Sequence, residues 1–167
     1  MNQTTSKQIR ILAIALSANG FGYCVMENHG MLEKGKKRAK GNKNLHSLSK
    51  IEKLMKQFLP TALVLQDVNA TGCRRAPRIK ALHQQVIGLA AKQKCKVALI
   101  TKEKSRITLL GDVKGTKHEM AEFLAQKYPV ELAGKLPPKR RLWETENSRM
   151  DIFDAVALAV VFRMIEK

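Results

Sequence analysis

The sequence predicts an α/β fold built on a mixed sheet that has an antiparallel edge and helices on both faces. Two observations predict this class: strand-like apolar runs come first along the chain, and strand and helix patterns then alternate. At 167 residues with 44% hydrophobic residues, the chain has the size and composition of one globular domain. We therefore expect a single domain over residues 1–167, in which the polar segment 1–8 is disordered.

The first part of the predicted sheet is antiparallel. Residues 9–17, IRILAIALS, and residues 20–27, GFGYCVME, are apolar runs joined by a short turn at Asn19-Gly20, which predicts a hairpin. A third strand that includes residues 31–34 precedes the basic segment 35–44, which has the composition of a loop. These three strands place the antiparallel edge at the start of the chain.

Helices and strands alternate in the remainder of the chain. Pro60 ends the first predicted helix, and Thr116 is positioned to cap a later one. In mixed sheets of this kind ligands bind beyond the carboxyl ends of the strands, so we expect the site near Ser17 and the Gln66-Asp67 step. The predicted elements are, in order, a helix over 45–59, a strand over 61–68, a helix over 78–94, a strand over 96–101, a helix over 117–127 and a helix beginning near Arg149.

The charge of the chain favours a nucleic-acid partner, because the formal net charge is +17 and the pI is near 10.1. The positive residues cluster over residues 35–44, 73–80 and 135–141, all punctuated by glycine or proline. A solvated face or an acidic membrane surface would also suit this charge, but no amphipathic helix with an aromatic face accompanies it. The candidate DNA-binding residues in these clusters are Lys36, Lys37, Arg38, Arg74, Arg75 and Arg78.

Cysteine usage and hydropathy indicate a cytoplasmic protein. Cys24, Cys73 and Cys95 are scattered without a CxxC pair, which is typical of reduced thiols. A membrane-spanning helix needs about 20 apolar residues, and the apolar run over residues 155–162 is far shorter. The opening residues lack the apolar core of a signal peptide. We therefore expect no membrane partner.

Two aspartates stand three residues apart at the start of the last predicted helix, MDIFDAVALAVVF. Residues with this spacing are neighbours on a helix, so the carboxylates of Asp151 and Asp154 point the same way. Carboxylates among apolar neighbours must be hydrogen-bonded, protonated or bound to a cation. The pair therefore indicates either a metal site or a helix cap, in which Ser148 and Asp151 would form a capping box.

Four segments together resemble the RuvC family of Holliday junction resolvases, within the ribonuclease H-like superfamily. The segments are ILAIALSANGFGYCVM, ALVLQDV, GTKHEMAEFL and DIFDAVALAVVF, of which the last is the most specific. The resemblance implies a homodimer that binds four-way DNA junctions and resolves them as an endonuclease in DNA recombination and repair. It also implies a cluster of carboxylates that holds two Mg²⁺ ions during phosphodiester hydrolysis, with Mn²⁺ as a substitute.

Two of the carboxylate positions implied by the resemblance are substituted. The first-strand aspartate is Ala15 and the central-strand glutamate is Gln66, so the implied catalytic and metal-binding set is Ala15, Gln66, Asp151 and Asp154. An alanine methyl group cannot ligate a metal, and a glutamine amide offers a neutral oxygen in place of a charge. We therefore expect a weakened magnesium site in a protein that binds DNA but cuts it poorly or not at all.

Two explanations of this departure stay open, together with one alternative function. An engineered inactive variant would keep Asp151, Asp154 and Lys117, as this chain does. A natural pseudo-nuclease would bind branched nucleic acid without cutting it. The third alternative is a ribonuclease H-like enzyme that acts on RNA–DNA hybrid or on a transposition intermediate.

Several further residues are candidates through the resemblance. Lys117 matches a catalytic lysine beside the scissile phosphate, although a surface lysine would also explain it. Arg106 lies where the family often has another basic residue. The loop over residues 69–78 matches the family segment that enters the junction centre, but it has arginines in place of the usual aromatic side chain.

Other candidates have equally good structural explanations. Ser17, Asn19 and Asn69 either position substrate or form turns. The apolar stripe of the helix over residues 78–94 either forms the dimer face or covers the sheet of its own protomer. His83, on the same helix, is interpreted as a packing residue.

Overall fold

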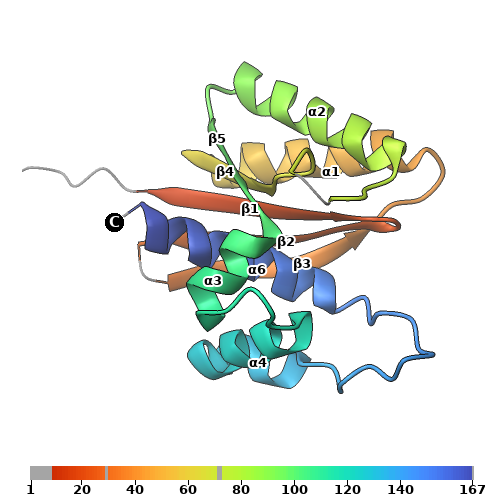
Figure 1. The fold of residues 1–167 in the computed structure, drawn as a ribbon. Coiled ribbons are helices and arrows are strands. Elements are labelled where there is room, and N and C mark those ends of the chain that lie inside the picture. The colour runs from red at the N-terminus through yellow and green to blue at the C-terminus, as the bar shows by residue number, and fades with distance from the viewer. Residues whose placement is uncertain (1–8, 29, 71–72, 167) are drawn as a thin grey trace, which may run out of the picture.

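The computed structural model describes residues 9–28, 30–70 and 73–166. The predicted disorder of residues 1–8 lies outside the described residues. One five-stranded sheet, in the order β3-β2-β1-β4-β5, forms the middle layer, with helices on both of its faces (Figure 1). The predicted fold class is therefore confirmed.

The sheet is antiparallel on one side and parallel on the other. β1 pairs antiparallel with β2, and β2 pairs antiparallel with β3. β1 also pairs parallel with β4, and β4 with β5, so the carboxyl ends of these three strands lie at the same edge. The strands are β1 (Arg10–Ser17), β2 (Gly20–Glu27), β3 (Gly30–Arg38), β4 (Ala62–Gln66) and β5 (Lys96–Ile100).

The third strand is longer than predicted, and the expectation of a loop from residue 35 is wrong. Lys36, Lys37 and Arg38 lie on β3, because the ladder with β2 continues to its last residue. The glycine at 35 is accommodated in the strand by close packing against the ring of Tyr23. Three of the candidate DNA-binding residues therefore project from a rigid edge strand.

Two helical layers enclose the sheet (Figure 1). One face is covered by α1 (Lys43–Phe58) and α2 (Pro77–Lys92). The other face is covered by α3 (Lys102–Leu110), α4 (Lys117–Lys127) and α6 (Met150–Ile165), with the short α5 (Pro129–Leu132) and the 3-10 turn η1 (Ala133–Lys135) after α4. Within the described residues, no helix combines the length and apolar character that crossing a membrane requires.

The sequence did not predict α3, because its first residues, KEKSR, show no apolar periodicity. Its ends are nevertheless well defined. The Thr101 side chain accepts a hydrogen bond from the backbone N–H of Lys104, which caps the start of the helix. Gly111 adopts a left-handed conformation with φ of 74°, which ends it.

The apolar stripe of α2 covers the sheet of its own protomer. Leu82, Val86 and Ala90 are fully buried within the chain, and Leu89 packs against the same cluster. These side chains therefore do not form a free dimer face. The homodimer stays a prediction, without a face assigned to it.

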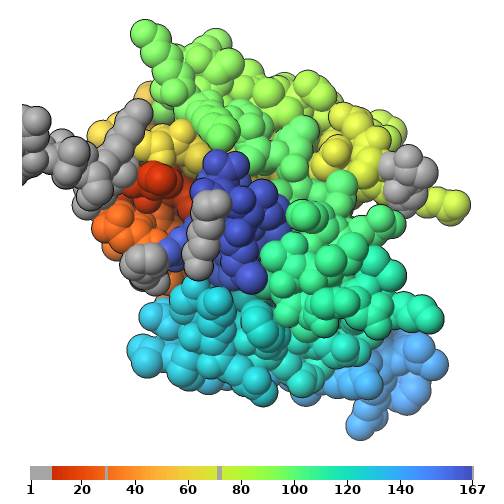
Figure 2. Space-filling model, turned by 60° about the vertical axis from the view of Figure 1, so that its left-hand side comes forward, coloured from red at the N-terminus to blue at the C-terminus, as the bar shows by residue number. Residues whose placement is uncertain are grey.

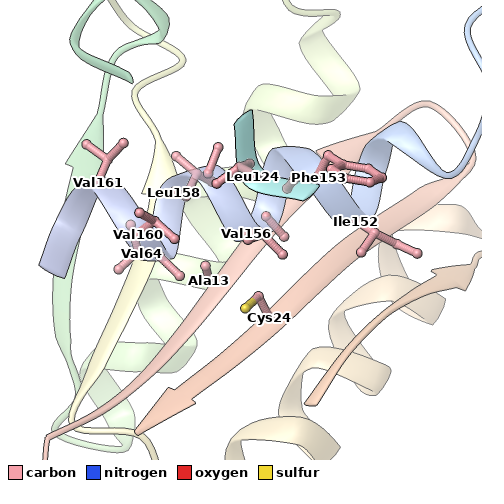
Figure 3. Packing of buried hydrophobic residues seen from close by; sticks show 14 of the residues in the cluster. Ala13, Cys24, Val64, Leu124, Ile152, Phe153, Val156, Leu158, Val160 and Val161 are labelled. Atoms are coloured by element: carbon pink, nitrogen blue, oxygen red, sulfur yellow. The ribbon is translucent and has the colours of Figure 1, made fainter. Parts of the chain in front are cut away.

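Strand alternation sorts the core into two halves. On β1, Ile11, Ala13 and Ala15 face α6, whereas the residues between them face α1 and α2. Figure 3 shows Ala13 and other small or β-branched side chains directly beneath the apolar surface of α6. The same face of the sheet therefore presents position 15 and supports the helix that carries the two aspartates.

Gly22 brings α6 close to the sheet. It lies opposite Ala15 in the β1–β2 ladder. A Cβ atom at this position would clash with the backbone carbonyl of Asp151, so only glycine allows the approach. The first turn of α6 is consequently held over the ends of β1 and β2.

Candidate functional site

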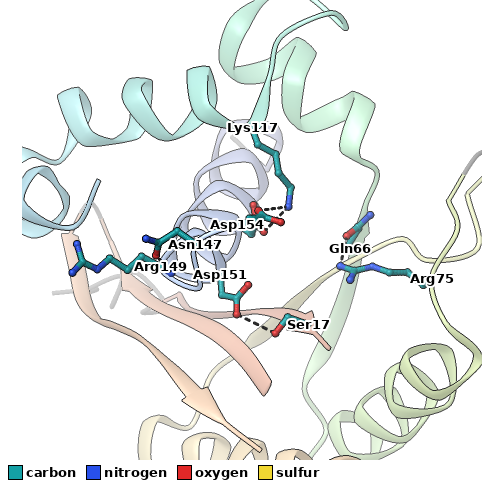
Figure 4. A network of polar contacts seen from close by, with 9 residues as sticks. Ser17, Gln66, Arg75, Lys117, Asn147, Arg149, Asp151 and Asp154 are labelled. Atoms are coloured by element: carbon teal, nitrogen blue, oxygen red, sulfur yellow. Dashed lines mark hydrogen bonds and ion pairs between the residues drawn. The ribbon is translucent and has the colours of Figure 1, made fainter. Parts of the chain in front are cut away.

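The candidate site lies where the carboxyl ends of the parallel strands meet the first turn of α6. Figure 4 shows side chains from β1, β4, α4 and α6 directed toward this edge. Ser17 ends β1, Gln66 ends β4, and Lys117 begins α4. The predicted position of the site relative to the sheet agrees with this arrangement.

Asp151 faces β1 and does not cap its helix. Ser17 Oγ donates a hydrogen bond to Asp151 Oδ2 at 3.0 Å. The capping box was a wrong alternative. The N-cap residue of α6 is Arg149, whose side chain makes no capping hydrogen bond, and the Ser148 hydroxyl accepts a hydrogen bond from Lys36 Nζ. Burial raises the pKa of Asp151 above its usual range, and the nearby charge of Asp154 adds to this effect.

Asp154 forms an ion pair with Lys117. Nζ of Lys117 lies 3.2 Å from Asp154 Oδ2 and 2.9 Å from Glu146 Oε1, so one ammonium bridges two carboxylates. Burial raises the pKa of Asp154, although the attraction of Lys117 opposes this shift. Burial alone would lower the pKa of Lys117, but the two carboxylates together outweigh it and its pKa is raised.

Gln66 is held at both ends by basic side chains. Arg75 Nη2 donates a hydrogen bond to Gln66 Oε1 at 3.1 Å. His83 Nε2 lies 2.9 Å from the backbone oxygen of Gln66. His83 is only 1% exposed, and burial lowers its pKa. Because the backbone oxygen of Gln66 can only accept, Nε2 is the donor of this hydrogen bond. The predicted packing role of His83 is consistent with this position.

A small pocket, called here the edge pocket, brings the candidate residues together. Its apolar wall contains Ala15, Ile100 and Leu158. Its polar and charged lining consists of Gln66, Arg75, Lys102, Ser105, Arg106, Lys117 and Asp154. Four side chains of the lining are cationic and one is a carboxylate.

The described side chains do not fit a two-ion metal centre. Hard divalent cations need several oxygen ligands, which are mostly anionic. Across residues 9–28, 30–70 and 73–166, no group of three or more His, Cys, Asp or Glu side chains is placed to hold a metal ion. Ala15 offers no donor, and Asp154 is already paired with Lys117. Magnesium binding stays a prediction.

The structure brings together most of the residues predicted for the site, but not all of them. Asp151 is hydrogen-bonded to Ser17 at the end of β1 and does not line the edge pocket. Arg78 points elsewhere and donates hydrogen bonds to Asn44 and to the backbone of Ala18. The residues gathered in the edge pocket are Ala15, Gln66, Arg75, Arg106, Lys117 and Asp154, whereas Arg74 and the basic residues of β3 lie outside its lining.

Two residues of the site were not predicted. Lys102 follows the carboxyl end of β5, which is a signal that strand order alone could have supplied. Glu146 lies in the irregular segment before α6, and nothing in its local sequence connects it with Lys117. Its carboxylate contributes to the raised pKa of both aspartates.

The strand order, the helical layers and the acidic pair above the sheet define a ribonuclease H-like α/β fold. Among solved structures, the chain is similar to RuvC of Thermus thermophilus, alone and in complex with Holliday junction substrate. Both have 13% sequence identity and a TM-score of 0.69, covering 95% of this chain and 95% and 94% of those chains. The yeast mitochondrial Holliday junction resolvase Ydc2 has 15% identity and a TM-score of 0.62, covering 92% of this chain and 77% of that chain.

These similarities show that the chain has the fold of the RuvC-like Holliday junction resolvases, as the sequence predicted. No protein-family model matches the sequence, and no curated protein matches it either.

Proposed function

We propose that this protein binds branched DNA, with a preference for four-way junctions, and cuts it poorly or not at all. The observation that carries the proposal is the lining of the edge pocket. Where the resemblance implies carboxylates on β1 and β4, the pocket has Ala15 and Gln66, and cationic side chains outnumber the one carboxylate in its lining.

The binding part of the proposal is supported by charge and by fold. The net charge of +17 would attract any polyanion, so charge alone does not select a junction. The fold supports a preference for junctions, since one of the similar structures is described as RuvC in complex with Holliday junction substrate. We propose that two copies of the chain bind one junction, because a two-fold substrate is matched by a two-fold dimer.

The proposed contacts fall into two groups. Arg75, Arg106 and Lys117 line the edge pocket and would contact the backbone at the centre of the bound segment. The exposed Arg74, the basic residues of β3 and Arg78 would contact flanking phosphates. Neither group reads bases in this proposal, so the preference would be for structure and not for sequence.

The impaired cutting follows from the ligand set. Attack on a phosphodiester needs stabilisation of charge on the attacking and leaving oxygens. The residues implied for that task include an alanine methyl, an amide already bonded to Arg75 and a carboxylate already paired with Lys117. We therefore expect these three groups to give little support to hydrolysis.

A binding and cleavage experiment tests the proposal. Labelled four-way junction, duplex, RNA–DNA hybrid and single strand of equal length would be titrated with the protein at fixed salt, and cutting would be followed on denaturing gels with Mg²⁺ or Mn²⁺. We expect the junction to bind at least tenfold more tightly than duplex, with little or no cleavage. Equal affinity for all four substrates would contradict the junction preference, and rapid cleavage would contradict the impairment.

A further inference from the structure

The edge pocket has more positive charge than its carboxylate balances. Arg75, Lys102, Arg106 and Lys117 come from three separate elements of the fold, whereas Asp154 is the one carboxylate of the lining. Like charges that line one small pocket repel one another, and water, salt or a bound anion would reduce this repulsion. Partial burial lowers the pKa of Lys102, and the charges of Lys117 and Arg75 lower it further.

Two donors in this cluster lack acceptors. The Nε–H groups of Arg75 and Arg106 are buried and have no hydrogen-bond partner in the part of the chain that the structure describes. Buried donors without partners are rare in folded proteins and need an explanation. An oxyanion in the pocket would offer acceptors to the guanidinium groups that line it.

The substitutions at positions 15 and 66 remove what would repel an anion there. Ala15 presents a methyl group and leaves the floor of the pocket uncharged. Gln66 is neutral, and its amide oxygen holds Arg75 at the pocket through the 3.1 Å hydrogen bond. A carboxylate at either position would compete with an anion for the same cations.

We propose that the edge pocket binds one phosphate group of the DNA backbone directly, through Arg75, Lys102 and Arg106 and without a metal ion. That the phosphate belongs to DNA rests on the proposed function. That the pocket has affinity for a phosphate group does not. The cationic side chains carry out the charge neutralisation for which a nuclease of this fold would use metal ions.

DNA binding in the absence of metal tests the first part of this inference. The affinity for a labelled junction would be measured in EDTA and in Mg²⁺ at matched ionic strength, with Lys102→Ala compared with Lys104→Ala. Lys104 is also exposed on α3 but does not line the pocket. We expect EDTA to leave the affinity of the unaltered protein within twofold. Lys102→Ala should weaken binding about tenfold and reduce the slope of log K against log salt by about 0.9.

Inorganic phosphate tests the pocket independently of DNA. Phosphate at millimolar concentration should raise the melting temperature of the unaltered protein above that in chloride of equal ionic strength, and the rise should be lost in Lys102→Ala but kept in Lys104→Ala. Binding that requires Mg²⁺, or a Lys102→Ala variant that behaves like Lys104→Ala in both assays, would overturn the proposal. Junction preference in the unaltered protein would survive either result, so the two proposals fail separately.

A second inference concerns the segment between η1 and α6, which stands out from the body of the molecule (Figure 1; light blue in Figure 2). Trp143 is the single tryptophan of the chain and is 77% exposed, and Leu142 beside it is fully exposed. Exposing large apolar side chains is unfavourable unless a partner covers them. Arg141 lies over the indole ring, with its guanidinium carbon 5.7 Å from the ring centroid.

The base of this segment is attached to the candidate site. Glu146 pairs with Lys117, and Ser148 accepts a hydrogen bond from Lys36 on β3. Trp143 is three residues from Glu146, which limits the separation of their Cα atoms to about 11 Å. Trp143 is therefore only three residues from a side chain that is ion-paired at the candidate site.

We infer that Trp143 stacks on an unpaired or unstacked base of branched DNA, with the neighbouring cations on its phosphates. Aromatic side chains next to cations suit this ligand, since every base has a π face. This inference also rests on the proposed function, but it does not depend on the phosphate pocket.

Because the chain has one tryptophan, its fluorescence reports the contact directly. We expect junction DNA to quench the emission, Trp143→Phe to keep affinity within about threefold, and Trp143→Ala to lose about fivefold or more. Val130→Ala, which truncates a side chain that is 93% exposed on α5, is the matched control and should have no effect. Unchanged emission at saturating junction, or a Trp143→Ala variant with normal affinity, would overturn the stacking while leaving junction binding intact.

Discussion

Restoring the two implied carboxylates is the most informative perturbation of the site. The double variant Ala15→Asp, Gln66→Glu would change the lining of the edge pocket from four cations and one carboxylate to four cations and three carboxylates. Ala15 is only 7% exposed, so an aspartate there would be largely buried. Effective desolvation costs several kcal/mol for a buried ion, and only part of this is returned by Lys117 and Arg75. The variant should therefore be less stable than the unaltered protein when no divalent cation is present.

Magnesium should reverse much of this loss. A ligand present at 100 times its dissociation constant stabilises the folded state by about 2.7 kcal/mol. In a chain of this length that corresponds to a rise in melting temperature of roughly 5–11 °C. The unaltered protein should show almost no rise, since no group of three acidic or other metal-binding side chains is present among its described residues.

Thermal unfolding in EDTA and in MgCl₂ at matched ionic strength measures this difference, and a denaturing gel of labelled junction detects the accompanying cleavage. The control is Ala15→Asn, which has the shape of aspartate without its charge and should respond to Mg²⁺ no more than the unaltered protein. A double variant that is folded by circular dichroism but shows neither a Mg²⁺-dependent rise nor cleavage would refute the reasoning. Positions 15 and 66 would then not be the places of lost catalytic carboxylates.

Three further predictions concern stability. Gly22→Ala should lower the free energy of unfolding by about 1–3 kcal/mol or more, because the added methyl group meets the backbone of α6. Gly88→Ala is the control and should not lower it, since a Cβ atom there would meet no atom within 4 Å. Thermal unfolding of both variants checks this. Burial raises the pKa of Asp154, so the folded protein holds a proton on this carboxyl more tightly than the unfolded chain does. The resulting stability is present at a pH below the unfolded pKa, and it is lost as the pH rises through the folded pKa. Asp154→Asn should remove that loss. In urea titrations between about pH 4 and pH 7, the free energy of unfolding of this variant should therefore fall less than that of the unaltered protein. An equal fall in both proteins would contradict the burial effect. Arg10→Ala should cost about 1.5–3 kcal/mol in the same titrations, because Glu27, whose side chain is 11% exposed, loses two donated hydrogen bonds; a loss under 0.5 kcal/mol would show the pair to be solvent-screened.

The part of the site that lies on regular elements could be predicted from the sequence. Ala15 and Gln66 share a face of the sheet because side chains alternate along strands, and α6 carries Asp151 and Asp154 on one side because they are three residues apart. The order of the strands then brings these elements to one edge. Periodicity and strand order thus explain why the four positions lie near one edge, whereas the resemblance alone singled out Ala15 and Gln66.

The remaining part could not be predicted, because it depends on contacts without a local signal. Glu146 is brought to Lys117 by an irregular segment whose path no periodicity describes. β3 extends through Lys36 and Arg38 because the ladder with β2 outweighs the loop-like composition of that segment. The pairing of Gln66 with Arg75 likewise results from the path of the chain between β4 and α2.

Neutral side chains at positions 15 and 66 would connect the two parts of the proposed function, impaired cutting and DNA binding. Unit charges 4 Å apart interact by about 4 kcal/mol at an effective dielectric constant of 20, so replacing two carboxylates by neutral groups alters the local potential by several kcal/mol per unit charge. With them, Lys117 and Arg75 would be counter-ions in an acidic cluster; without them, the same side chains make the pocket attractive to phosphate and unfavourable for Mg²⁺. With neutral side chains at both positions, we propose that the pocket favours an anion where a carboxylate cluster would favour a cation. Metal-independent DNA binding and impaired hydrolysis are therefore expected to occur together.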